Sequence, residues 1–139
     1  MKRLLTILTL SLSIALLPGC SWFQGDCAKA MPSITQGQAN VGEAILSVQQ
    51  VVRELSGVNL TTNELNAAIE ATSKANAALR SIEAELDAAA GACTTIDVVD
   101  LFKEFVTIWG SIELLFAAHP KLLVPTPHVV MLARRVVMR

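Results

Sequence analysis

Three cysteines and two histidines are the side chains of this 139-residue chain best suited to covalent or metal chemistry. The cysteines are Cys20, Cys27 and Cys93, and no two of them have the Cys-x-x-Cys spacing of redox-active and zinc-binding motifs. His119 and His128 both lie towards the C-terminal end, and we expect His119 to lie near the terminal carbonyls of a helix. We therefore expect no metal site and no cofactor.

The acidic residues do not form a catalytic pattern either. Glu83 and Asp87 are four residues apart, which is typical of a solvated helix face. The sequence has no Gly-rich phosphate loop, no His-Glu metal motif and no nucleophile elbow, so we expect a protein that is not an enzyme. The formal net charge is −1 and there is no basic stripe, so we expect no nucleic-acid partner.

The first 20 residues have the layout of an export signal. Lys2 and Arg3 form a short cationic start, and the apolar stretch 4–17 that follows is too short to cross a bilayer as a helix. It ends in Leu-Pro-Gly-Cys at residues 17–20, a tetrapeptide that resembles the lipobox of bacterial lipoproteins.

The resemblance covers only residues 1–21, and it implies an address but no activity. It implies that the signal peptide 1–19 is removed, that the Cys20 thiol carries diacylglycerol, and that the new N-terminus is acylated. Two or three acyl chains make a durable membrane anchor, whereas one holds a protein only marginally. Ser21 follows the cysteine in place of an aspartate, which by the family rule directs the protein to the outer membrane, facing the periplasm.

An apolar seven-residue repeat runs through 33–56 and again through 62–90. Gly57 and Gly91 follow the two segments, and the second begins with the spacing of a capping box. The pattern predicts an antiparallel, coiled-coil-like helical hairpin. The predicted seam consists of Ile34, Val41, Ala44, Val48, Val51 and Leu55 in the first helix, Val58 in the turn that follows, and Leu65, Ala68, Thr72, Ala75, Leu79, Ile82, Leu86 and Ala89 in the second helix.

The hairpin brings the two remaining cysteines together. With Cys20 used for lipid, Cys27 and Cys93 form an even pair in an oxidising compartment, which favours a disulfide. They lie at almost equal distances in sequence from the turn at Asn59, so both should reach the open end of the hairpin. Residues 20–32 are expected to be the lipidated cysteine and a tether.

A third helix is predicted over 95–118, with an unusually wide apolar face. One interpretation is that this face completes a three-helix core. The other is that Phe105, Trp109, Ile112 and Phe116 contact a partner, a second copy or the membrane surface.

The tail 119–139 is predicted to be a short extended linker followed by a basic amphipathic helix that Pro127 opens. Arg134, Arg135 and Arg139 could contact anionic lipid or an acidic partner. The alternative is a loosely packed terminus.

These patterns predict an all-α protein: a helical hairpin plus a third apolar helix, together a small three-helix bundle over 33–118, with a short C-terminal helix. We expect a lipid-anchored envelope lipoprotein that serves as a structural or protein-interaction module, with an envelope protein or a second copy as its partner. Two alternatives remain open. One is a phage-encoded envelope lipoprotein, either a spanin-type lysis subunit or a superinfection-exclusion protein. The other is a periplasmic inhibitor or ligand-binding module.

Overall fold

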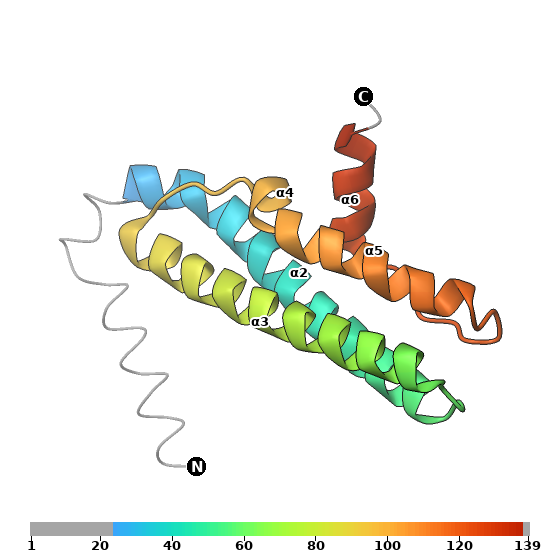
Figure 1. Cartoon of the computed structure of the whole chain (residues 1–139). Coiled ribbons are helices and arrows are strands. Elements are labelled where there is room, and N and C mark those ends of the chain that lie inside the picture. Colours follow the sequence, from blue (N-terminus) through green and yellow to red (C-terminus); the bar gives the residue numbers. More distant parts are fainter. Residues whose placement is uncertain (1–23, 138–139) are drawn as a thin grey trace, which may run out of the picture.

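The computed structural model describes residues 24–137, so the predicted signal peptide, Cys20 and Arg139 lie outside the described residues. The part that it describes is all-α and contains no strand, as the sequence predicted. Figure 1 shows a long helical hairpin with a third layer packed along it. The helices are α2 (Gln24–Ser56), α3 (Thr62–Ala92), α4 (Val98–Leu101), α5 (Lys103–Ala117) and α6 (His128–Val137).

The seam between α2 and α3 follows the predicted heptads in α2, where its residues from Ile34 to Leu55 are buried. The register in α3 is partly different, because Leu65 is 47% exposed and Thr72 is only half-buried. Ala71 and Ala78, which the heptads did not predict, are buried instead. The buried stripe of α3 is wider than a coiled-coil seam because α5 also packs on this helix.

The first helix begins earlier than predicted. Residues 24–32 were expected to belong to a tether, but they form the first turns of α2, with Pro32 inside the helix. A proline in a helix interior removes one backbone hydrogen bond and costs about 3 kcal/mol. Packing offsets this cost, because Ile34, two residues further on, is buried against Ala89 of α3.

The end of α3 also differs from the prediction, which placed it at Gly91. The helix continues to Ala92, and Cys93 takes the left-handed C-cap conformation with φ of 53°. Its N–H donates to the carbonyl of Ala89, and that of Thr94 donates to the same oxygen. The capping hydrogen bonds are therefore made two residues later than a glycine cap would make them.

The predicted third helix, 95–118, is broken into α4 and α5. Asp97 caps α4, where its Oδ1 accepts from the N–H of Asp100 at 3.2 Å. The break falls at Phe102, whose side chain is fully buried with its ring edge-on to that of Phe105. The separate single turn of α4 places the Phe102 side chain in the core, while α5 packs along α3.

The apolar face of α5 is core. Phe105, Trp109 and Ile112 are at most 1% exposed, and Phe116 is half-buried against the same cluster. The prediction that the first three contact a partner or a membrane is therefore wrong, and the three-helix-core interpretation is correct. The physical reason is the small alanine side chains of α3, which let α5 approach closely enough to bury these rings.

The last described helix, α6, is packed on the bundle through its first half. Val129, Val130 and Ala133 of α6 are buried, and the backbone N–H of His128 donates to Glu43 Oε1 of α2 at 2.7 Å. Figure 1 shows α6 crossing the other helices steeply and projecting from the bundle. Its first half is therefore anchored, while Val137 near its end is 86% exposed.

Candidate functional site

The base of the hairpin carries the two cysteines that were predicted to pair. Cys27 on the first turns of α2 and Cys93 at the end of α3 are joined as a disulfide, with their Cα atoms 4.6 Å apart. This separation lies within the usual range for disulfides. The bond closes a loop with a sequence separation of 66, for which the chain-entropy model gives about 4 kcal/mol of stabilisation.

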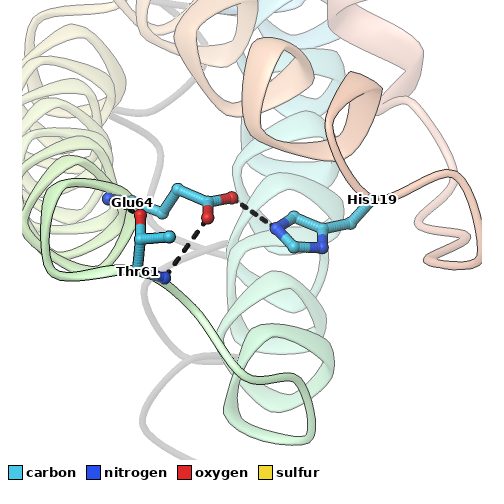
Figure 2. A network of polar contacts seen from close by, with 3 residues as sticks. All are labelled: Thr61, Glu64 and His119. Carbon is cyan, nitrogen blue, oxygen red and sulfur yellow. Dashed lines mark hydrogen bonds and ion pairs between the residues drawn. The ribbon is translucent and has the colours of Figure 1, made fainter.

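The opposite end of the hairpin carries a polar network, shown in Figure 2. The hydroxyl of Thr61 accepts from the N–H of Glu64, and the carboxylate of Glu64 accepts from the N–H of Thr61, both at 3.2 Å. This is the predicted capping box. The other carboxylate oxygen of Glu64 contacts Nε2 of His119, which follows α5.

This network joins the start of α3 to the end of α5. His119 was expected to lie near the terminal carbonyls of its own helix, and its ring in fact reaches a carboxylate 55 residues away in sequence. The hydrogen bond from His119, followed by those from Thr61, lowers the pKa of Glu64 below its ordinary value of 4.5. The Thr61 hydroxyl and the Glu64 carboxylate both form the helix cap, and the contact with His119 links this cap to the end of α5. The arrangement therefore suits a structural role.

Between 24 and 137, no cluster of three or more His, Cys, Asp or Glu residues could hold a metal ion. In the same part of the chain, no helix is both long enough and apolar enough to span a bilayer.

The basic residues of α6 border a groove. Arg134 pairs with the carboxylate of Glu113 on α5, whereas Arg135 is exposed and pairs with no carboxylate in the described part of the chain. Between α6 and the α4–α5 segment lies an open groove of about 620 Å³. Its lining consists of Asp97, Val99, Asp100, Lys103, Val106, Thr107, Ala133, Arg134 and Val137.

The structure thus brings together only some of the predicted site residues. Arg134 and Arg135 share the projecting helix, whereas Phe105, Trp109 and Ile112 lie beneath the surface as core. Sequence reasoning did not find the groove, because it depends on the angle at which α6 leaves the bundle. The only sequence signal for it was the amphipathic pattern of the last helix.

Comparisons with protein-family models, curated proteins and solved structures find no match to this chain.

Proposed function

We propose that this chain is an exported lipoprotein, anchored by acyl chains on Cys20 to the outer membrane, whose helical domain is a structural or protein-interaction module facing the periplasm. The lipobox-like residues 17–20 support the anchor. The pairing of Cys27 with Cys93 is the observation that carries the address, because disulfides persist in oxidising compartments and are rare in the cytosol.

The geometry of the base fits an anchored domain. Cys20 precedes Gln24, the first residue of α2, by only a few residues, so the lipid would lie close to the hairpin base. The disulfide fastens this base, and a 33-residue helix extends about 50 Å from it at about 1.5 Å per residue. The lipid would thus hold one end of a stiff hairpin, and the other end and the α6 groove would face the periplasm.

An interaction role is supported by the surface that the fold leaves open. The core residues of α5 are covered by the bundle itself, whereas Arg134 and Arg135 of the projecting α6 remain exposed beside its groove. Its aliphatic lining and charged rim have the composition of a protein contact surface.

The proposal can be tested by intact and peptide mass spectrometry on membrane-extracted protein, with and without reductant. We expect an N-terminal peptide that begins at Cys20 and carries acyl mass, and a Cys27–Cys93 cross-linked peptide that reductant separates. Two matched variants assign the roles: Cys20→Ser should lose the acyl mass and keep the cross-link, whereas Cys27→Ser should do the reverse. An unmodified Cys20, or one cross-linked to Cys27, would refute the anchor.

A further inference from the structure

The groove between α6 and the α4–α5 segment is apolar inside and charged at its rim. Val99 of α4 and Val106 of α5 form one wall and are half-buried. Ala133 and Val137, one helical turn apart, line the opposite wall on α6. The charged residues at the groove are exposed, so its interior suits aliphatic side chains better than a polar small molecule.

The projecting helix α6 presents a second face. Met131 and Arg135 are also one turn apart, and both are exposed. The helical period places Arg135 about 160° around the axis from Val137, so it lies on the side away from the groove. One helix therefore carries an apolar wall of its own groove on one side and, on the other, the cation Arg135, which pairs with no carboxylate between residues 24 and 137.

The charges of the two surfaces are complementary. The described helix α6 contains Arg134 and Arg135 and no acidic residue. The α4–α5 wall carries Asp97 and Asp100, only partly balanced by Lys103. No ion pair to Asp97 or Asp100 occurs within residues 24–137.

We propose that two copies of this chain associate by inserting the exposed C-terminal half of α6 of each copy into the open mouth of the α6 groove of the other. The first half of each α6 keeps its own packing on α4 and α5, and only beyond it do the two α6 helices lie side by side between the two α4–α5 walls. In this two-fold arrangement Val137 packs against the partner's α6, while Met131 and Arg135 face the partner's α4–α5 wall. Arg135 then lies opposite Asp100 of the other copy, and the contact occurs twice by symmetry.

This inference deepens the proposed interaction function, because it names the partner as a second copy and the surface as the α6 groove. One short helix per copy covers less than the roughly 800 Å² per partner of a standard stable interface, so the association is weak in dilute solution. Anchoring both copies to one membrane raises their effective concentration, and a weak self-association becomes significant under that condition.

The test uses two copies of the full-length chain with different C-terminal tags, co-expressed and co-purified from detergent-solubilised membranes. Variant A carries Arg135→Glu and variant B carries Asp100→Lys. Like charges face each other twice in an A–A pair and twice in a B–B pair, so we expect each to lose about tenfold in co-purification. In an A–B pair both contacts are favourable, Glu to Lys and Arg to Asp, so co-purification should return to the wild-type level.

The control is Arg80→Glu, which makes the same charge change at an exposed position of α3 outside the groove and should leave co-purification unchanged. Circular dichroism on each variant checks that the helices are retained. The inference is overturned if wild-type copies do not co-purify, if A pairs with A as well as wild type does, or if A–B is no better than A–A. It is also overturned if Arg135→Glu abolishes retention on anionic vesicles but leaves pairing intact, because α6 would then contact lipid.

The same extracts separate this inference from the lipoprotein proposal. Acyl mass on Cys20 without pairing refutes only the self-association. Pairing without acyl mass refutes only the anchor.

Discussion

Two glycines inside α2 provide a matched test of how closely the hairpin helices pack. A Cβ added at Gly37 would lie 2.6 Å from Cδ2 of Leu86 and 3.2 Å from Cδ1 of Ile96. A Cβ added at Gly42 would meet nothing within 4 Å. The substitutions Gly37→Ala and Gly42→Ala therefore share one backbone effect and differ in one packing effect.

The backbone effect is favourable at both positions, since alanine is better than glycine in a helix interior by about 1 kcal/mol. The packing effect applies only at Gly37, where the methyl group would overlap Leu86 and overpacking costs about 1–3 kcal/mol. We expect Gly42→Ala to raise the free energy of unfolding by about 1 kcal/mol. Gly37→Ala should leave it unchanged or lower it by up to about 2 kcal/mol, the difference between the two effects.

Urea unfolding followed by circular dichroism, with the disulfide intact in both variants, measures the two free energies. Repeating Gly37→Ala in a Leu86→Ala background isolates the contact, because truncating Leu86 makes room for the new methyl group. In that background Gly37→Ala should become stabilising. If both glycine substitutions stabilise the unmodified protein equally, the close approach of α2 and α3 at Gly37 is refuted.

Three further predictions concern the disulfide, the contact between Glu64 and His119, and the buried amide of Asn40. Reducing the bond between Cys27 and Cys93 should lower the free energy of unfolding by about 4 kcal/mol, and hydrogen exchange measured by mass spectrometry should rise first in residues 24–32; an equal rise along the whole of α2 would contradict a local role for the bond. The pKa of Glu64 is lower in the folded state, so the unfolded state binds more protons; the resulting stabilisation is present above pH 4.5 and is lost as the pH falls through the lowered pKa. In urea titrations at pH values from 4.5 downwards, wild type should lose stability relative to Glu64→Gln, and parallel pH profiles of the two proteins would contradict the pairing. The Nδ2 of Asn40 has no hydrogen-bond partner in the described structure although the residue is 4% exposed, so Asn40→Leu should raise the melting temperature, with a gain in stability of about 1 kcal/mol, and a lower melting temperature would show that the amide is satisfied.

The parts of the fold that local pattern determines could be predicted from the sequence. The α2 seam, the capping box at Thr61 and the meeting of the two cysteines all follow from spacing along a regular helix. The heptads placed Leu65 in the seam, and this was wrong because they describe a two-helix contact whereas α3 contacts both α2 and α5. The break at Phe102 likewise depends on a tertiary contact, the burial of one ring, which the periodicity of the sequence does not predict.

The candidate site was less predictable for the same reason. Amphipathic spacing identified Arg134 and Arg135 on a C-terminal helix but gave no angle for that helix. The angle depends on contacts made by single residues, such as the hydrogen bond from the His128 backbone to Glu43. The wide apolar face of the predicted third helix likewise marked Phe105 as a surface candidate, because the sequence alone does not show how much area the alanines of α3 can cover.

The two ends of the hairpin are fastened by different chemistry, and this has a consequence for how the domain can serve as an anchored module. The base is held by a covalent bond whose state follows the redox conditions, next to Pro32, where the helix lacks a backbone hydrogen bond. The other end is held by the contact between Glu64 and His119, which weakens as the pH falls through the lowered pKa of Glu64. Since α6 is attached to the middle of α2 through Glu43, neither fastening touches the groove directly. The proposed contact between copies uses neither the disulfide nor the Glu64–His119 contact, so the loss of either should affect it only through the helices that carry the groove.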